Sequence, residues 1–296
     1  MKYIIFDLEF NSGKNRRTGT AINEIIEIGA VMLDESLNEI ASFSKTVRPA
    51  LTLYLNKHVK QLCSITDREL KTAAGFNEVI DSFTRWCGKD CIFSSWSNTD
   101  LYVMLENMGA YKGKNSIPFI KKYFDMQKFV TRELPKTDNN QISLKSAAES
   151  FSISTDNFSL HRAKDDSGVC AELFRKTYSE DALKGYITDT SAPEYYARMA
   201  FKPYYITDLE KYEIPSRTFS CACPYCRKRM RKISKTTQKF SVFYTKMLCL
   251  RCKRCFDLQV KIKKTFDSFD IKKKLREQTA DKPLNIQTDE SSAGKE

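Results

Sequence analysis

The chain has 296 residues, of which 41% are hydrophobic and 29% are charged, a balance that is typical of a globular protein and excludes wholesale disorder. No apolar run approaches the roughly 18 residues of a membrane span, and the opening segment MKYIIFDLEF is too short and too acidic for a signal peptide, so we expect a cytoplasmic protein that does not enter the membrane. The formal net charge of +12 is uneven, because Lys211 to Glu277 carries 20 Lys and Arg residues against five Asp and Glu residues. The sequence therefore predicts a polyanion-binding unit joined to a slightly acidic body.

The first two thirds of the chain predict strands followed by alternating strands and helices. Residues 3–8 are typical of a buried strand, and residues 24–33 and 39–48 of its partners, because β-branched and aromatic residues are frequent in them. A short strand is expected over residues 91–96, and apolar residues at helical spacing follow it. This order predicts an α/β domain over residues 1–185.

The remainder divides by composition. Residues 186–215 contain three prolines among tyrosines and are expected to form a linker. Residues 216–277 are rich in cysteine and basic residues, with strands expected over 240–248 and 256–262 and a short basic helix over 265–277. Residues 278–296 are polar and are expected to be a disordered tail.

Carboxylates occur at the ends of two predicted strands. Asp7 and Glu9 are two residues apart on a strand, so their side chains point to the same face. They would repel each other unless a cation lies between them or the strand end is solvated, and this pair alone does not decide between the two. Asp100 follows another strand and opens a helix, where an acid also stabilises the helix N-terminus without any further role.

A third group of polar residues is His161-Arg-Ala-Lys-Asp-Asp166. The chain has two histidines, and His58 shares a helical face with apolar residues, so His161 is the candidate for a base that works near neutral pH. Asp166 shares its helical face with Val169 and therefore points toward the domain, whereas Asp165 suits a solvent-facing capping role.

Three segments resemble the three motifs of the DnaQ-like, DEDDh 3′→5′ exonucleases: residues 6–10, residues 95–100 and residues 161–166. A predicted helix that begins with Ser143-Leu144-Lys145 precedes the last of them, as in that family. The similarity covers roughly residues 1–180, and the Asp-Leu-Glu-Phe-Asn start is similar to the KapD-like and histone-mRNA-trimming exoribonuclease branch. The resemblance implies a ribonuclease H-like mixed sheet flanked by helices. It also implies that RNA is degraded from a free 3′ end to nucleoside 5′-monophosphates.

The resemblance also assigns roles to residues. Asp7, Glu9, Asp100 and Asp166 would hold two Mg²⁺ or Mn²⁺ ions, and His161 would take the proton from the attacking water. Phe10 would stack under the terminal base or pack in the core, and backbone groups from Glu9 to Asn11 would reach the terminal ribose.

The C-terminal cysteines have the spacing of metal ligands. Cys223-Pro-Tyr-Cys226 and Cys252-Lys-Arg-Cys255 are two Cys-x-x-Cys knuckles with a strand between them, which predicts a zinc ribbon with one structural Zn²⁺. Cys249 with Cys252 makes an equally valid second knuckle, but a strand through Cys249 favours Cys252 with Cys255. A unit of this size has few large apolar side chains and would need the metal to fold.

Basic residues surround both knuckles and are candidate contacts to phosphates. They are Arg227, Lys228, Arg229, Arg251, Lys253 and Arg254. The sequence thus favours a metal-dependent exonuclease with nucleic acid, RNA before DNA, as its partner. A ribonucleoprotein partner, a DNA exonuclease in proofreading or repair, and a nucleic-acid-binding adaptor without catalysis remain alternatives.

Overall fold

In a computed structural model, the chain forms two compact units, Met1–Ala200 and the segment that begins at Phe201. The structure describes residues 1–278 apart from residue 64, residues 136–141, residue 157 and residues 159–160, so the predicted disordered tail lies outside the described residues except for Gln278. Among the described helices, none is both long and apolar enough to cross a membrane.

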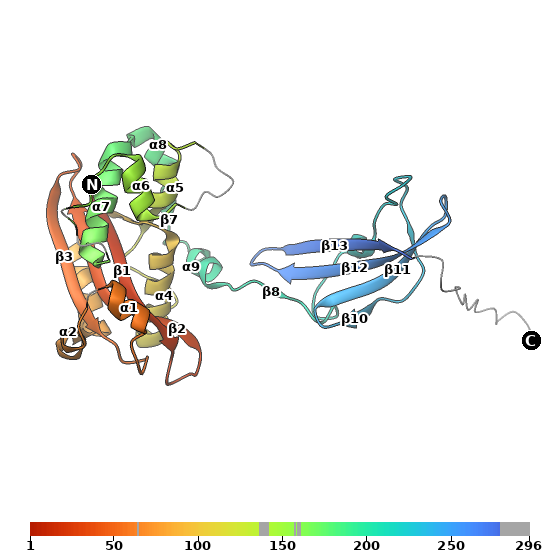
Figure 1. The fold of residues 1–296 in the computed structure, drawn as a ribbon, viewed down its shortest axis with the longest axis horizontal. Coiled ribbons are helices and arrows are strands. Elements are labelled where there is room, and N and C mark those ends of the chain that lie inside the picture. The colour runs from red at the N-terminus through yellow and green to blue at the C-terminus, as the bar shows by residue number, and fades with distance from the viewer. Residues whose placement is uncertain (64, 136–141, 157, 159–160, 279–296) are drawn as a thin grey trace, which may run out of the picture. The chain divides into compact units, whose positions relative to one another are not determined.

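The first unit is built on a seven-stranded mixed sheet (Figure 1). Its long central strand β1 (Lys2–Lys14) pairs antiparallel with β2 (Ala21–Leu33) and parallel with β5 (Cys91–Ser95). The sheet order is β4-β3-β2-β1-β5-β6-β7, where the remaining strands are β3 (Glu39–Arg48), β4 (Ala74–Gly75), β6 (Lys122–Asp125) and β7 (Thr188–Asp189). Every strand predicted in this part of the sequence is present.

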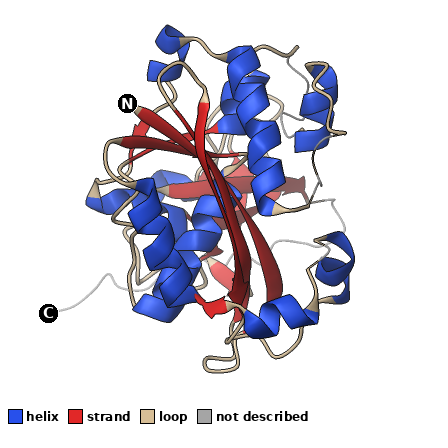
Figure 2. Cartoon of the chain, turned by 90° about the vertical axis from the view of Figure 1, so that its left-hand side faces the viewer, coloured by secondary structure: helices blue, strands red, loops and turns tan. Residues whose placement is uncertain are grey.

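Helices cover both faces of this sheet (Figure 2). Ile4, Phe6 and Leu8 of β1 pack in one core with α3 (Phe76–Cys87) and α4 (Asn98–Lys112). Tyr3 and Ile5 point the other way and pack with α5 (Met126–Thr131), α6 (Leu144–Ser150) and α7 (Ala163–Thr177). Because side chains alternate along a strand, the odd-numbered residues of β1 that follow Ile5 face α7. The mixed sheet flanked by helices that was expected from the sequence is present.

The connection between the units is shorter than the predicted linker over residues 186–215. β7 pairs with β6, and α9 (Pro193–Ala200) contributes Tyr196 to the core beside α3 and α4. On the other side of Ala200, β8 (Tyr204–Tyr205) pairs with a strand of the second unit, whose core includes Ile206. Of the tyrosines that appeared to mark a linker, Tyr196 is therefore a core residue, whereas Tyr204 and Tyr205 are exposed. Three short helices complete the described part of the first unit: α1 (Lys57–Leu62), α2 (Asp67–Thr72) and α8 (Glu180–Lys184).

The second unit is a six-stranded sheet that contains the two predicted strands as β11 (Val242–Cys249) and β12 (Arg254–Lys264). The basic helix predicted over residues 265–277 is wrong, because β13 (Phe269–Glu277) is a strand paired antiparallel with β12. Phe269, Ile271 and Leu275 are spaced at intervals of two and four, which places all three on the core side of a strand. The shorter elements are β9 (Arg231–Lys232), β10 (Thr237–Lys239) and the 3₁₀ turn Ser216–Phe219.

Candidate active site

Three carboxylates meet on the α7 side of the sheet. Asp7 and Glu9 project from β1 toward α7, and Asp166 lies in the first turn of α7. One carboxylate oxygen from each side chain lies within 4.8 Å of the others, and all three residues are half-buried. Acids contributed by two elements that are 150 residues apart in the chain thus share one small space.

Asp100 closes the site from a different element. It lies in the first turn of α4, where Ser97 caps the helix, and only 7% of its surface is exposed. Burial raises the pKa of Asp100 to about 7, although hydrogen bonds from the backbone of Leu8 and the hydroxyl of Ser95 partly offset this effect. Because Leu8 lies between Asp7 and Glu9, this contact ties Asp100 to the strand that carries them.

The acids raise the pKa values of one another. Burial, and then the charges of Asp100 and Asp166, hold the pKa of Asp7 well above its usual range. Burial also raises the pKa of Glu9 to about 7 and that of Asp166 to about 6. Such a cluster is costly without a counter-charge. An oxygen-only donor set of this kind suits hard divalent cations such as Mg²⁺ or Mn²⁺.

This cluster predicts how pH affects stability in EDTA. A carboxyl whose pKa is higher in the folded protein than in the unfolded chain binds more protons when folded, so its contribution to stability falls as pH rises. The wild-type free energy of unfolding should therefore fall between about pH 4 and pH 7, the interval between the ordinary and the raised pKa values of Glu9 and Asp100. The fall should be steeper than in Asp7→Asn, which lacks one of the raised pKa values. Saturating Mg²⁺ should remove most of the fall. Urea unfolding at several pH values checks this, and a wild-type advantage that grows with pH in EDTA would contradict it.

His161 lies at the entrance to α7. Its backbone N–H donates to Oδ2 of Asp166 at 3.3 Å, and its backbone adopts a left-handed conformation with φ 71°. The residue is exposed, so its imidazole is accessible to a ligand beside the acids. The other histidine, His58, has a side chain outside the described residues.

An ion pair that the sequence analysis missed holds α7 against the sheet. Glu27 of β2 is 1% exposed, stands directly opposite Glu9 and accepts from Nη2 of Arg162 at 2.7 Å. It also accepts from the backbone N–H of Ala163 at 3.1 Å. Glu27 thus anchors the segment between His161 and Asp166. The signal in the sequence is that Glu27 is the one charged residue between Ile25 and Leu33, a run that is otherwise apolar or glycine.

Gly29 allows the same helix to approach. It stands opposite Asp7 in β2, and a Cβ placed there would lie 2.0 Å from the backbone nitrogen of Lys164 and 2.1 Å from the carbonyl carbon of Ala163. Both atoms belong to the backbone of α7, so the clash could be relieved only if α7 moved away from β2. The close approach brings Asp166 within reach of Asp7.

Gly29→Ala is therefore expected to destabilise the first unit by about 3 kcal/mol and to reduce hydrolysis, because a displaced α7 takes Asp166 with it. Gly75→Ala is the matched control, since a Cβ at Gly75 meets nothing within 4 Å and its φ is −75°. Urea unfolding of both variants checks the prediction, which fails if the two changes cost the same.

Cys63 touches the acid cluster from another side. Its Sγ lies 2.8 Å from Oε2 of Glu9 and donates to it. The thiol is buried, and burial together with the adjacent carboxylates raises its pKa. The neutral thiol of Cys63 therefore donates a hydrogen bond that orients the carboxylate of Glu9.

Phe10 and Asn11 both have defined packing in the structure. Phe10 is half-buried and packs against the core beside α3 and α4. Asn11 is fully buried, and its amide donates to Oγ1 of Thr52 and to the carbonyl of Tyr54 while accepting from the backbone N–H of Asn56. Its side chain therefore holds this loop, and the contact of the backbone from Glu9 to Asn11 with the terminal ribose stays a prediction.

Four cysteines meet in the second unit, but not the four favoured from the sequence. The sulfurs of Cys223, Cys226, Cys249 and Cys252 lie within 4.8 Å of one another. Cys255 lies outside this group, because it belongs to β12 and is paired opposite Leu248. Cys249 is the last residue of β11, so the turn after it brings Cys252 back and the backbone N–H of Cys252 points to the Cys249 sulfur at 3.4 Å.

The sulfur spacing fits a tetrahedral metal. The Cys223–Cys252 and Cys226–Cys249 sulfurs are 3.9 and 3.5 Å apart. Tetrahedral thiolates at a Zn–S distance of about 2.3 Å lie about 3.8 Å from one another. The cysteine cluster therefore fits a zinc ribbon.

The predicted basic contacts of the knuckles differ in their availability. Arg254 is engaged within the protein, because Nη1 pairs with Glu277 at 2.7 Å and the guanidinium lies over the ring of Tyr225. The other five are exposed and lie in the turns around the cysteines: Arg227, Lys228, Arg229, Arg251 and Lys253.

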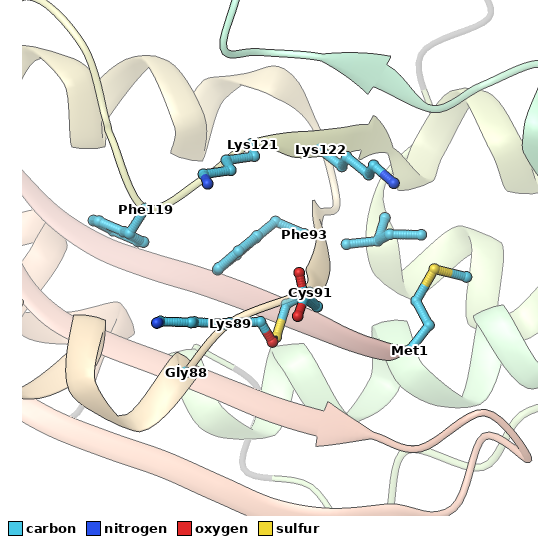
Figure 3. A pocket seen from close by; sticks show the side chains of 10 residues that line it. Met1, Gly88, Lys89, Cys91, Phe93, Phe119, Lys121 and Lys122 are labelled. Atoms are coloured by element: carbon cyan, nitrogen blue, oxygen red, sulfur yellow. The ribbon is translucent and has the colours of Figure 1, made fainter.

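Cavities of about 480 and 500 Å³ are present in the described part of the first unit. One of about 480 Å³ is lined by Lys89, Lys121 and Lys122 with Phe93 and Phe119 (Figure 3). It adjoins the start of β5, which pairs with the start of β1, so it lies away from the acids further along β1.

The other cavity, of about 500 Å³, is lined by Asn98 and Thr99, the residues just before Asp100, together with residues of α4 and α9: Tyr102, Tyr195, Arg198 and Met199. The aromatic and basic lining of this second cavity was not predicted, because α9 was expected to be a linker.

Known proteins resemble the chain in sequence and in fold. The family model RNase_T, described as exonuclease, matches residues 4–174. The DNA polymerase III subunit epsilon of Treponema pallidum is 28% identical over 167 residues, which are 56% of this chain and 74% of that protein. The corresponding subunit of Aquifex aeolicus is 25% identical over 180 residues, 60% of this chain and 81% of that protein.

Two solved structures are similar in fold. The nuclease domain of 3′hExo, a DEDDh family member bound to rAMP, has a TM-score of 0.50 at 22% identity and covers 58% of this chain and 88% of that chain. Cell-death related nuclease 4 (CRN-4) has a TM-score of 0.50 at 21% identity and covers 77% of this chain and 86% of that chain.

Proposed function

The chain belongs to the RNase_T exonuclease family, and on that premise we propose that it is a DEDDh-type 3′→5′ exonuclease that degrades single-stranded RNA to nucleoside 5′-monophosphates. The observation that carries the proposal is the convergence of Asp7, Glu9 and Asp166 within 4.8 Å beside the buried Asp100. Nothing in ordinary packing favours four acids in this arrangement, because their burial raises their pKa values and weakens the fold. This also argues against an adaptor that has no use for catalysis.

The four acids would hold two Mg²⁺ or Mn²⁺ ions. Bound there, such ions stabilise the attacking and leaving oxygens of a displacement at phosphorus. Asp7 has a carboxylate oxygen within 4.8 Å of those of Glu9 and Asp166, and the charge of Asp100 contributes most, after burial, to its raised pKa. It is therefore the candidate ligand shared by both ions.

His161 would remove the proton from the attacking water. The backbone N–H of His161 is hydrogen-bonded to Asp166, so the residue is fixed at the edge of the acid cluster, and its exposed side chain can return the proton to solvent. Glu27 acts through position only, because its carboxylate is occupied by Arg162 and Ala163.

The preference for RNA is supported by the Asp7-Leu8-Glu9-Phe10-Asn11 start of the first motif, which is similar to the exoribonuclease branch. A DNA substrate is the second candidate, because the curated relatives are subunits of DNA polymerase III. Selection between the sugars depends on contacts to the 2′-hydroxyl at the terminal nucleotide.

The test compares 5′-labelled RNA and DNA of the same 20-nucleotide sequence in Mg²⁺ and in Mn²⁺. We expect nucleoside 5′-monophosphates from the 3′ end, with RNA consumed at least about tenfold faster, a difference of about 1.4 kcal/mol in transition-state stabilisation. Equal or faster loss of DNA would replace RNA by DNA in the proposal. Cleavage within strands whose 3′ ends are blocked would refute an exonuclease altogether.

The second unit would bind one structural Zn²⁺ through Cys223, Cys226, Cys249 and Cys252 and would supply affinity for the substrate strand. Its support is the sulfur geometry and the excess of basic residues between Lys211 and Glu277. A second unit of this kind could also bind an RNA strand that is part of a ribonucleoprotein.

A further inference from the structure

The two faces of the β12–β13 ribbon have opposite character. Leu258, Val260 and Ile262 of β12 are buried in the core of the second unit, with Ile271 and Leu275 of β13 packed against them. The residues between them face away from that core. These outward positions carry five cations: Lys261, Lys263, Lys272, Lys274 and Arg276.

The register places two of these cations, Lys261 and Lys272, directly opposite each other. Lys274 stands opposite Gln259, and Lys263 stands opposite Asp270. Like charges in directly opposed positions of a sheet destabilise it. Among the residues that the structure describes, none of the five cations forms an ion pair, and Asp257, opposite Arg276, accepts from Gln278 instead.

Aromatic rings lie on the same outward face. Tyr205 of β8 is paired opposite Lys263, is 43% exposed, and has the ammonium group of Lys261 5.9 Å from the centre of its ring. Tyr244 of β11 stands opposite Gln259 and is half-buried. An aromatic side chain beside rows of cations is the combination that binds single-stranded nucleic acid, because bases stack on rings while cations neutralise phosphates.

We propose that this surface, defined as Lys261, Lys263, Lys272, Lys274, Arg276 and Tyr205 and called the basic sheet face, binds single-stranded nucleic acid. The cations along β13 recur about every 6.8 Å, the distance of two strand residues, and a second row lies about 4.8 Å away on β12. They therefore form a straight track for a phosphate backbone. The basic sheet face is distinct from the basic residues around the cysteine knuckles that the sequence predicted as contacts, one of which, Arg254, is paired with Glu277.

The inference deepens the proposed function, which supplies nucleic acid as the ligand, and its test separates binding from catalysis. The full chain carrying Asp7→Asn is used with fluorescein-labelled U₂₀ and dT₂₀ in buffer without Mg²⁺, Mn²⁺ or chelator, so that strands are bound without being cut and the zinc of the second unit is retained. The sheet-face variant is K261Q/K263Q/K272Q/K274Q. The control variant K71Q/K89Q/K114Q/K176Q also removes four positive charges, but from exposed positions of the first unit.

We expect the sheet-face variant to lose at least about tenfold in affinity at 0.1 M salt, and its slope of log K against log salt to become shallower by about 2.8, or about 0.7 for each lost phosphate contact. The control variant is expected to change the slope by less than one unit. Tyr205→Ala should weaken binding of both strands without changing the slope, since a ring neutralises no phosphate.

Folding is monitored separately by thermal unfolding. Removal of the Lys261–Lys272 repulsion should leave the melting temperature of the sheet-face variant equal to or above that of its parent. Equal losses of affinity in the two four-site variants, or none in the sheet-face variant, would overturn the inference. Competition by poly-glutamate as effective as that by U₂₀ would also overturn it, in favour of an acidic protein as the partner. Cleavage assays do not enter this test, so failure of binding and failure of the proposed hydrolysis remain distinguishable.

Discussion

Asp7→Asn is expected to abolish hydrolysis and, in EDTA, to raise the melting temperature of the first unit. Asp7 is surrounded by acids whose burial and charges hold its pKa well above the ordinary value, so the neutral amide removes repulsion from the metal-free protein. The same amide is a poor ligand for a hard cation. Loss of several kcal/mol of metal-ion stabilisation corresponds to a decrease in rate on the order of 10³-fold or more.

The opposite signs of the two effects distinguish a catalytic ligand from a structural residue. Each kcal/mol of repulsion that is removed should raise the melting temperature by roughly 2–4 °C for a unit of this size. Asp165→Asn is the control, because Asp165 lies in the same turn of α7 as Asp166 but does not belong to the acid cluster. Single-turnover cleavage and calorimetry of both variants check the prediction. An Asp7→Asn protein that is inactive and less stable in EDTA would show that the change disrupts packing.

The second large effect is expected at the cysteine cluster. Cys249→Ser should lose zinc and unfold the second unit, whereas Cys255→Ser should retain one Zn²⁺ per chain. The reason is geometric: the Cys249 sulfur lies 3.5 Å from that of Cys226, and Cys255 lies outside the group. Binding of structural zinc contributes roughly 10–16 kcal/mol in small zinc domains, more than the folding free energy of such a unit.

Metal analysis of the purified variants and circular dichroism before and after a strong chelator provide the measurements. Wild-type protein and Cys255→Ser should contain zinc at one per chain and lose β-structure when it is removed. Zinc retained by Cys249→Ser but lost from Cys255→Ser would restore the pairing favoured from the sequence and refute the sulfur geometry.

The parts of the fold that the sequence predicted are those with strong local patterns. The apolar runs at residues 3–8 and 24–33 are buried strands, and the apolar spacing after Asp100 is the buried face of α4. The four acids were assigned to one site through the resemblance of their segments to the three exonuclease motifs, because the residue patterns alone left other roles open. The exonuclease family is confirmed by the match over residues 4–174.

The missed features depend on contacts that are distant in the sequence. The side-chain pairing of Glu27 with Arg162 spans 135 residues, and the role of Gly29 appears only when α7 crosses β2. β13 was predicted as a helix because three consecutive lysines obscure its period of two, and its pairing with β12 decides the outcome. For the same reason Cys249 and Cys255 were indistinguishable by spacing until the register of β11 and β12 was known.

The central claim is that Asp7, Glu9, Asp100 and Asp166 form one site for two divalent ions. The most direct measurement is a Mn²⁺ titration of the intact chain, with free Mn²⁺ followed by electron paramagnetic resonance. Two bound ions are predicted for the wild-type protein, with binding lost or reduced to one weak ion in Asp7→Asn and unchanged in Asp165→Asn. Equal Mn²⁺ binding by the wild-type protein and Asp7→Asn would contradict the claim.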